Sequence, residues 1–288
     1  MMSASKKRGL AVVTGAAGGL GSSFANRLAE RGYHLLLVDR RQAKLEQVCE
    51  AVSSRHGTTA EPYAADLCNR EEVERLAKRL EQMEDVELLV NNAGFGTLDY
   101  FVDTDAGLLV SMVDLHIVAP TMLTRAVLPG MIERNSGGII NVSSMGAWFH
   151  SAGNAQYGST KICLTAFSMA LHEELRGTNV RVQALCPGFV RTEFHEAESM
   201  KGFQRCSPTQ KMWASPDEVV ECSLRRLAGR QVIVVPGFGY RIVGRLARIP
   251  MLQPLMQRIT RVPRVPPASS QPIVSRSEPP VSVESLDS

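Results

Sequence analysis

The sequence lacks the features that mark several other classes of protein. No uninterrupted apolar run approaches the ~20 residues of a membrane-spanning helix, and the basic, polar start, Met1–Arg8, has no apolar signal core. The six cysteines are scattered, without a C-x-x-C pair or metal-ligand spacing, and no segment repeats at solenoid periods. We therefore expect a cytoplasmic protein with reduced thiols and no metal site.

Acidic residues are also absent from one long stretch near the C-terminus. Between Glu221 and Glu278 the chain has ten arginines and no Asp or Glu. The net charge of the whole chain is +3, so the rest carries about −7 once these ten are subtracted (3 − 10). An overall charge this close to neutral argues against a nucleic-acid binder, and the C-terminal part is a separate electrostatic region.

Short apolar runs alternate with amphipathic segments along most of the chain. The apolar runs predict strands at Leu10–Val13, Leu35–Val38, Ala60–Ala64, Val86–Val90, Gly138–Val142, Val180–Leu185 and Val232–Val235. The amphipathic segments predict helices from the first turn to about Arg31 and over Ala43–Ser54, Arg70–Gln82, Ala106–Val118, Pro120–Arg134, Gln156–Arg176 and Pro216–Leu227. This alternation predicts an α/β fold with a parallel, doubly wound sheet that helices cover on both faces.

Composition divides the chain into four parts. Its 288 residues, 44% of them hydrophobic, are enough for one α/β core. We place this single domain at residues 8–236, after a flexible N-terminus at 1–7. Residues 237–262 form a basic amphipathic extension, and residues 263–288, with six Pro and seven Ser, form a disordered tail.

One short segment carries a candidate catalytic pair. Tyr157 and Lys161 are four residues apart, so they share one face of the predicted helix and the ammonium can lie beside the phenol. A phenol with a pKa near ~10 is a poor acid–base catalyst at neutral pH, and a fixed cation nearby favours its phenolate. Such pairs also occur by chance, but here Ser144 follows a predicted strand upstream. With the glycine-rich turn after the first strand, these residues indicate hydride transfer on a nicotinamide cofactor.

The glycine-rich turn is a candidate phosphate-binding loop. Gly15, Gly19 and Gly21 follow the first strand, where small residues let the backbone approach a pyrophosphate at a helix N-terminus. A turn that merely connects strand and helix is the alternative. Asp39 ends the second strand and can accept hydrogen bonds from both ribose hydroxyls, so NAD is the expected cofactor. Arg40 or Arg41 could instead pair with a 2′-phosphate, which makes NADP the alternative.

Residues ~8 to 236 resemble the short-chain dehydrogenases/reductases. The matching pieces, in chain order, are Gly15-x-x-x-Gly19-x-Gly21, Asp66, Asn91-Asn92-Ala93-Gly94, Ser144, Tyr157-x-x-x-Lys161 and Pro187-Gly188-Phe189-Val190-Arg191-Thr192. The resemblance implies a Rossmann-type sheet of about seven strands and assembly into homodimers or homotetramers through the two long helices.

The resemblance also implies roles for individual residues. Tyr157 would exchange a proton with the substrate oxygen, Ser144 would hold that oxygen, and Lys161 would bind the nicotinamide ribose. Asp66 would meet the adenine edge, Asn92 the ribose region, and residues 187–192 the carboxamide. The implied cofactor-binding set is Gly15, Ala17, Gly19, Leu20, Gly21, Asp39, Arg40, Asp66, Leu67, Asn92, Ala93, Gly94, Tyr157, Lys161, Pro187, Gly188, Val190 and Thr192.

One position departs from the family pattern. His116 stands where the family normally carries an Asn that orders a water linking the lysine to solvent. A histidine can also bind a water and relay a proton, so we include His116 among the catalytic candidates. The alternative is that the backbone carbonyl orders the water and the ring is a spectator.

Large apolar side chains near these motifs predict an apolar substrate. The candidates for the substrate pocket are Phe95, Trp148, Phe149 and Phe194, and Glu193–Trp213 is expected to be a lid. Each of these side chains could equally be ordinary packing. The expected substrate is a lipid-like or polycyclic molecule with a carbonyl or alcohol group.

The basic extension leaves two further functions open. Residues 240–262 could contact an anionic membrane surface peripherally, or their apolar face could cover the cleft or a sister subunit. Beside the oxidoreductase, the sequence therefore leaves two alternatives: a cofactor-binding regulator or scaffold without turnover, and a membrane-surface interaction protein.

Overall fold

The computed structural model describes residues 9–97, 99–149, 153–196, 213–229 and 231–246. The expected N-terminal segment, most of the expected lid and the tail beyond Leu246 lie outside these residues.

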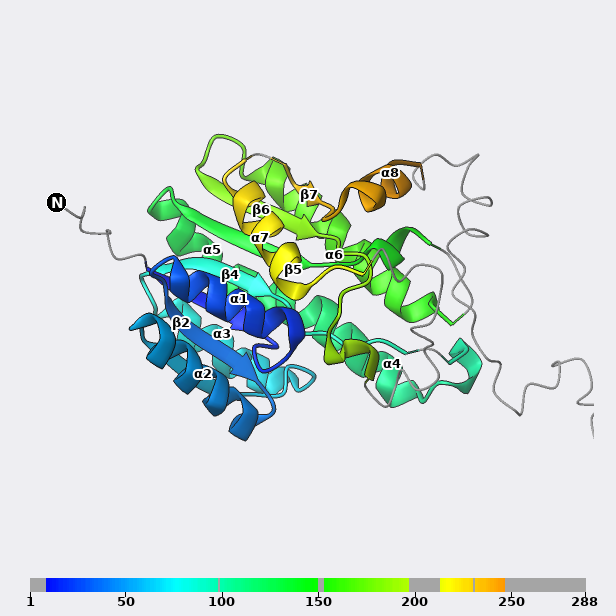
Figure 1. The fold of residues 1–288 in the computed structure, drawn as a ribbon, viewed down its shortest axis with the longest axis horizontal. Coiled ribbons are helices and arrows are strands. Elements are labelled where there is room, and N and C mark those ends of the chain that lie inside the picture. Colours follow the sequence, from blue (N-terminus) through cyan, green and yellow to red (C-terminus); the bar gives the residue numbers. More distant parts are fainter. Residues whose placement is uncertain (1–8, 98, 150–152, 197–212, 230, 247–288) are drawn as a thin grey trace, which may run out of the picture.

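Seven parallel strands form one sheet in the order β3-β2-β1-β4-β5-β6-β7 (Figure 1). The strands are β1 (Leu10–Thr14), β2 (His34–Asp39), β3 (Ala60–Ala64), β4 (Val86–Asn91), β5 (Gly137–Val142), β6 (Val180–Leu185) and β7 (Ile233–Val234). This is the Rossmann-type, doubly wound sheet predicted from the sequence, and the prediction is confirmed. Pro62 lies in β3, at the edge of the sheet, where a missing N–H costs no ladder hydrogen bond.

Helices cover the sheet on both faces because its central strands are apolar on both sides. One face packs against α1 (Gly19–Glu30), α2 (Gln42–His56) and α7 (Pro216–Leu227) through residues such as Phe24, Leu45 and Val219. The other face packs against α3 (Arg70–Glu81), α5 (Ala119–Glu133) and α6 (Ala155–Glu174) through residues such as Leu76 and Leu123. The chain order reverses between β1 and β4, and at such a switch point the carboxyl ends of the strands form a ligand crevice.

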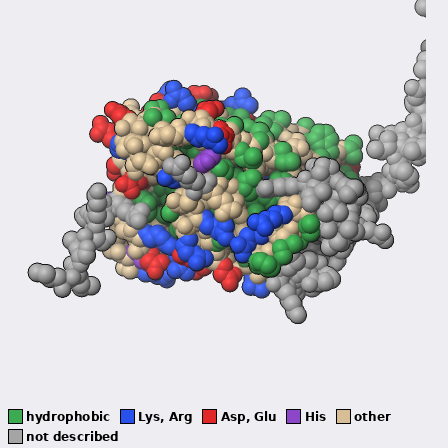
Figure 2. Space-filling view, turned by 90° about the horizontal axis from the view of Figure 1, so that it is seen from above, with side chains coloured by type: hydrophobic (Ala, Val, Ile, Leu, Met, Phe, Trp, Pro, Cys, Tyr) green, Lys and Arg blue, Asp and Glu red, His purple; other side chains and the backbone are tan. Residues whose placement is uncertain are grey.

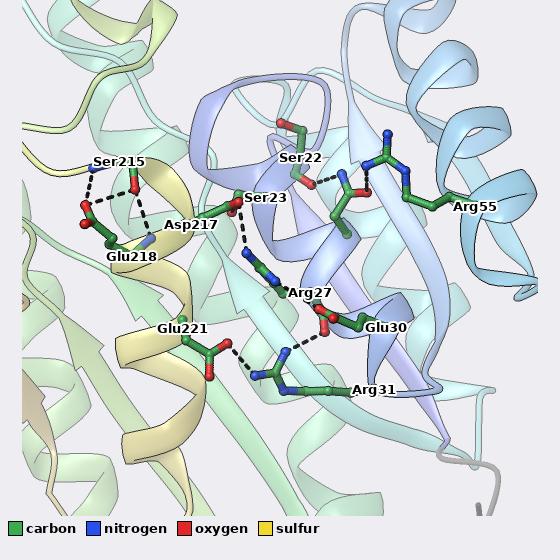
Figure 3. A network of polar contacts seen from close by, with 11 residues as sticks. Ser22, Ser23, Arg27, Glu30, Arg31, Arg55, Ser215, Asp217, Glu218 and Glu221 are labelled. Atoms are coloured by element: carbon green, nitrogen blue, oxygen red, sulfur yellow. Dashed lines mark hydrogen bonds and ion pairs between the residues drawn. The ribbon is translucent and has the colours of Figure 1, made fainter.

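A polar network fixes α7 beside α1, although some 190 residues separate them in the sequence (Figure 3). Asp217 accepts a hydrogen bond from Ser23 and pairs with Arg27 at 3.0 Å, and Arg31 pairs with Glu221 at 2.6 Å. The charged side chains of this network are partly exposed to solvent, so the network orients α7 more than it stabilises the fold.

The segment expected to form two helices is continuous. α4 (Ala106–Val113) runs into the π-helical turn η2 (Asp114–Val118) and then into α5. In this wide turn the Ala119 N–H donates to the Asp114 carbonyl, so the chain stays helical up to Pro120, which has no N–H to donate.

This continuous helix corrects the expectation that nothing approaches the length of a membrane span. By length and composition alone, Ala106–Glu133 is long and apolar enough to cross a membrane, and 33% of its most apolar window is buried in the protein. A core helix passes the same test, and α5 packs against α3 and β4 as a layer of the sheet fold.

Candidate active site

The three catalytic candidates meet at the carboxyl end of β5. Ser144 follows β5 and caps the 3-10 turn η3 (Met145–Trp148), where its Oγ accepts a hydrogen bond from the Gly146 N–H at 3.0 Å. Tyr157 and Lys161 lie on the first turns of α6, and the Lys161 Nζ is 5.8 Å from the centroid of the Tyr157 ring. A Cβ on Gly146 would lie 3.2 Å from the Ser144 Oγ and 3.5 Å from the Tyr157 ring, so the two side chains are neighbours. The predicted catalytic residues are therefore close together.

Burial disfavours the charged form of both Tyr157 and Lys161. Burial raises the pKa of Tyr157 above its ordinary value, and the hydrogen bond with Ser144 offsets part of that effect. Lys161 is only 4% exposed, its Nζ donates to the Val142 carbonyl at 3.0 Å, and burial lowers its pKa to about 8. Without a ligand, Tyr157 is thus a neutral hydroxyl at neutral pH, and Lys161 loses its proton in the mildly basic range.

The depressed pKa of Lys161 predicts a pH-dependent stability. Between about pH 8 and the model-peptide value the unfolded chain holds a proton that the folded chain has lost, so the free energy of unfolding rises with pH there. The free energy of unfolding of wild type minus that of Lys161→Met should rise by about 2 kcal/mol from about pH 8 to 9.5. Urea unfolding of both proteins at several pH values measures it. If this difference in unfolding free energy did not change with pH, folding would not lower the pKa of Lys161.

Polar side chains below the site fix the backbone of α6. Ser143 donates to the Lys161 carbonyl at 2.8 Å and also contacts Thr165. Deeper in the core, the Asn141 side chain accepts from Asn91 at 2.8 Å and donates to Ser168 at 2.9 Å. These residues join β4, β5 and α6, so the position of the catalytic helix relative to the strand ends is defined by buried hydrogen bonds.

The glycine-rich turn fits closely against the end of β4. Gly15 has a φ of +65°, and a Cβ on Gly21 would lie 2.1 Å from the Gly15 carbonyl oxygen. The Asn92 side chain donates to the Thr14 carbonyl at 2.8 Å, and the Thr14 hydroxyl accepts from the N–H groups of Asn92 and Ala93 at 3.0 Å each. Asn92 therefore holds the turn in place, and Thr14 is a supporting residue that the sequence analysis missed.

The N-terminus of α1 is free to take an anion. No side chain caps this helix, and its first turn has no acidic residue. A Cβ on Gly19 would lie 2.7 Å from Thr192, so the helix start and the loop after β6 approach each other. A bare helix N-terminus with small residues is the arrangement that binds a pyrophosphate, and the residues present therefore fit a dinucleotide.

Asp39 lies beside this loop and is fully hydrogen-bonded. Its carboxylate accepts from the Ala17 N–H at 3.0 Å and from both the backbone and the guanidinium of Arg41. Burial alone would raise the pKa of Asp39, but the Arg41 hydrogen bonds and charge lower it below its ordinary value. Arg41 also lies next to Gly18, where a Cβ would be 2.9 Å from one of its terminal nitrogens.

Arg41, rather than Arg40, is thus the arginine at the expected ribose position. Arg40 is exposed and makes no ion pair with another described residue, and its charge acts to lower the pKa of Cys68. The structure thus places Arg41 against Asp39, and Arg40 as a cofactor-binding residue stays a prediction. Both arginines follow Asp39 directly, so sequence spacing could not distinguish them.

Asp66 and Leu67 occupy the neighbouring turn after β3. The Asp66 carboxylate accepts from the Cys68 N–H at 3.0 Å, and Leu67 is buried. Leu20, in the first turn of α1, packs on the core against which α1 lies.

The loop after β6 is held in place by Tyr240, a residue outside the predicted domain at 8–236. Helix α8 (Phe238–Leu246) places Tyr240 so that its hydroxyl accepts from the Phe189 N–H at 3.1 Å. A Cβ on Gly188 would lie 2.1 Å from the Tyr240 ring, so only glycine fits there. Pro187 and Thr192 flank this stretch, and the Pro187 carbonyl accepts from the Met145 N–H. The start of the predicted extension therefore supports the catalytic end of the sheet, and no motif in the sequence indicated this.

The four candidate pocket residues fall into two groups. Phe194 lies 6.1 Å from the Tyr157 ring, between centroids, and Phe95 lies 5.9 Å from the His116 ring. Trp148 and Phe149 pack instead with Val235 and the apolar face of α8. The first pair adjoins the catalytic hydroxyls, whereas the second pair packs under the C-terminal helix.

This arrangement of sheet, glycine turn and Ser–Tyr–Lys cluster has known relatives. A profile of the family described as short chain dehydrogenase matches residues 9–201, more than half of the chain. This chain belongs to the short-chain dehydrogenase family.

Individual relatives share the fold over most of the described chain. The very-long-chain 3-oxoacyl-CoA reductase of Anas platyrhynchos is 34% identical over 203 residues, which are 69% of this chain and 64% of that protein. The uncharacterized oxidoreductase YmfI of Bacillus subtilis (strain 168) is 36% identical over 183 residues, 63% of this chain and 75% of that protein. This chain therefore spans less than two thirds of the length of the Anas reductase.

A solved structure gives the same comparison in three dimensions. The short-chain dehydrogenase from Sphingobium yanoikuyae in complex with NADPH superposes with a TM-score of 0.76 at 27% identity. The superposition covers 89% of this chain and 98% of that one. The whole sheet and its catalytic end thus follow the short-chain dehydrogenase pattern.

His116, the residue that departs from the short-chain dehydrogenase pattern, is held by two hydrogen bonds of its ring. Its Nε2 accepts from the Phe95 N–H at 3.2 Å, and its Nδ1 lies 2.9 Å from the Thr160 hydroxyl. Thr160 donates to the Tyr157 carbonyl, so the Nδ1–H must donate to Thr160. Burial, reinforced by the Lys161 charge, lowers the pKa of His116 well below its ordinary value. The ring is a neutral bridge between the loop after β4 and helix α6.

We therefore expect His116→Asn to keep an unchanged pH–rate profile between about pH 5.5 and 7.5, because the wild-type ring does not titrate there. The same substitution should destabilise the protein by about 1–3 kcal/mol, since Asn cannot make both hydrogen bonds. Initial rates across pH and thermal unfolding measure the two effects. An inflection near pH 6.5 in the pH–rate profile of wild type, absent from that of His116→Asn, would mean that the His116 ring relays a proton.

Proposed function

We propose that this protein is an NAD(P)-dependent oxidoreductase that interconverts a secondary alcohol and a ketone, or reduces an aldehyde. The observation that carries the proposal is that the Ser144 and Tyr157 side chains are neighbours at the carboxyl end of β5, with Lys161 buried on the same helix as Tyr157. Membership of the short-chain dehydrogenases supports the same class of reaction.

The residues of this chain have separate tasks in that reaction. The bound nicotinamide supplies or accepts the hydride at the substrate carbon. Ser144 and Tyr157 donate hydrogen bonds to the substrate oxygen, where negative charge develops during reduction. Tyr157 then gives up its phenolic proton to that oxygen, and the nearby Lys161 charge makes the resulting phenolate less costly. In the direction of oxidation the same proton returns to Tyr157.

The choice of cofactor depends on two side chains beside the glycine turn. Asp39 is held by Arg41, and a carboxylate at this position repels a 2′-phosphate. We propose NAD as the preferred cofactor. The Sphingobium yanoikuyae relative is in complex with NADPH, and Arg41 is the residue that would hold a 2′-phosphate here if Asp39 were neutral.

This predicts an outcome for substitutions at the ribose position. Asp39→Ala should shift the ratio of dissociation constants toward NADP by about tenfold or more, because Arg41 is released. Adding Arg41→Ala should cancel the gain, whereas adding Arg40→Ala, the matched control, should leave it in place. Fluorescence titration of each variant with NADH and NADPH measures this. A gain that depends on Arg40 would contradict the assignment.

The substrate is proposed to be apolar and bulky, of a lipid-like or polycyclic kind. The Phe194 ring lies beside the Tyr157 ring and the Phe95 ring lies beside the His116 ring, and such aromatic surfaces favour apolar ligands. The name of the Anas platyrhynchos relative, a very-long-chain 3-oxoacyl-CoA reductase, supports a long apolar substrate.

A panel of ketones, aldehydes and alcohols, followed by nicotinamide absorbance with both cofactors, tests the proposed function. We expect higher kcat/KM for bulky apolar carbonyls than for short ones. Absence of turnover on the whole panel, with cofactor binding intact, would instead favour a regulator that binds the cofactor.

We also propose a homodimer or homotetramer in the cytoplasm. Val110 on α4 and Ile162 and Met169 on α6 are between 41% and 57% exposed, so the two long helices present apolar side chains to solvent. The scattered cysteines, without the paired spacing of a disulfide framework, are typical of a reducing compartment. Analytical ultracentrifugation tests the assembly, and a monomer at micromolar concentration would refute it.

A further inference from the structure

A second cavity lies behind the catalytic end of the sheet, between α7, the end of β7 and α8. Its volume is about 830 Å³, within the range of sites that hold small molecules. Tyr240 lines it and separates it from the Gly188–Phe189 stretch of the loop after β6. Ser144, Tyr157 and Lys161 do not line it, so it is distinct from the candidate active site.

The charge of this cavity is positive. Three arginines line it, Arg225 and Arg226 from the last turn of α7 and Arg241 from α8, against a single carboxylate, Glu218. Glu218 is already engaged, because its carboxylate accepts from both the N–H and the hydroxyl of Ser215 in a capping box. Figure 2 views the molecule from the side of β7 and α8 and shows basic side chains beside hydrophobic ones on that face.

Arg241 is the arginine that lacks a partner. Arg225 pairs with Glu221 at 3.8 Å, and Arg226 donates to the Gln231 side chain at 2.7 Å. The Arg241 Nε is buried and has no hydrogen-bond partner within the described chain, and the guanidinium carbon lies 5.5 Å from the centroid of the Phe238 ring. Arg241 makes no ion pair with any other described residue, and an anionic group in the cavity would supply a counterion for its guanidinium.

The remaining wall is apolar. Phe238 is 72% exposed at the cavity edge, Trp213 stacks on Phe189 at 5.2 Å, and Val235 and Pro236 complete this side. A large exposed aromatic ring next to an unsatisfied guanidinium suits a ligand that has an apolar body and one anionic end.

We propose that this cavity binds an anionic amphiphile, with its carboxylate or phosphate on Arg241 and its hydrocarbon chain along Phe238 and Trp213. The site accounts for the unpaired Arg241 donor and the exposed Phe238 ring together. It does not depend on the proposed catalytic function, because none of its residues takes part in the reaction.

The protein has two tryptophans, Trp148 and Trp213, and this allows a direct test. In full-length Trp148→Phe, Trp213 is the sole tryptophan, so its emission reports the cavity and not the region under η3. We expect a saturable change on titration with dodecanoate and with dodecyl phosphate below their micelle concentrations. Dodecanol, which has the chain but no charge, should bind at least about tenfold more weakly.

Two charge-removing variants in the same background complete the test. Arg241→Gln should weaken dodecanoate binding by about tenfold or more, whereas Arg176→Gln, at an exposed arginine paired with Glu173 on α6, should leave it unchanged. Circular dichroism confirms that each variant is folded. Equal affinity for dodecanol, no effect of Arg241→Gln, or a response to anionic vesicles but not to the monomeric amphiphiles would each overturn the proposal. The last result would favour a membrane-facing surface.

Discussion

Replacing Tyr157 by Phe should lower kcat/KM by about three orders of magnitude while leaving the dissociation constant of the cofactor nearly unchanged. The ring and its packing against Phe194 remain, but the phenolic proton that the substrate oxygen needs is lost. Steady-state rates on a ketone that turns over with wild type, together with a cofactor titration, measure both effects.

Tyr63→Phe is the matched control for this substitution. Tyr63 lies in the edge strand β3 with its ring against Arg79, far from Ser144 in the sheet order, so loss of its hydroxyl should not alter the rate. Turnover of Tyr157→Phe within tenfold of wild type would remove Tyr157 from the chemistry, whatever the other residues do.

The second large effect is expected at the glycine turn. Gly21→Ala places a Cβ 2.1 Å from the Gly15 carbonyl oxygen and 2.8 Å from the Asn92 side-chain nitrogen, which is itself held by the Thr14 carbonyl. The start of α1 has to move away from β1, so we expect the dissociation constant of the cofactor to rise by about ten- to a hundredfold. Calorimetric titration with the preferred cofactor checks this.

Gly239→Ala is its control, because a Cβ there meets nothing within 4 Å and the backbone conformation is an ordinary one. This variant should bind the cofactor like wild type. If Gly21→Ala also bound normally, the close packing of the turn would not matter for the cofactor, and the phosphate-loop assignment would fail.

The sheet could be predicted from the sequence because its signal is local. Continuous apolar runs such as Leu35–Val38 can only be buried on both faces, and this requires helices above and below the sheet. The Tyr157–Lys161 spacing is local in the same sense, since four residues define one helix face. Ser144 could be predicted beside Tyr157 and Lys161 because it follows a strand, and the carboxyl ends of parallel strands meet at one edge of the sheet.

The remaining contacts depend on residues that are distant in the chain. Nothing local shows that Arg41 rather than Arg40 pairs with Asp39, because that depends on the backbone course at the start of α2. Tyr240 contacts Gly188 across about 50 residues, from a segment whose composition indicated a separate extension. The chemistry of His116 left a proton relay and a spectator ring both open, and its burial and its two hydrogen bonds could be seen only in the fold.

The transfer of deuterium from a reduced cofactor to a ketone tests the central claim most directly. The protein is incubated with NADH or NADPH carrying deuterium at C4 of the nicotinamide, on the transferred face, and with a bulky apolar ketone, and the alcohol is analysed by mass spectrometry. Hydride transfer at the Ser144–Tyr157–Lys161 site predicts one deuterium on the carbinol carbon with wild type and none above background with Tyr157→Phe. A protein that binds the cofactor yet forms no labelled alcohol from any ketone or aldehyde in the panel would contradict the account.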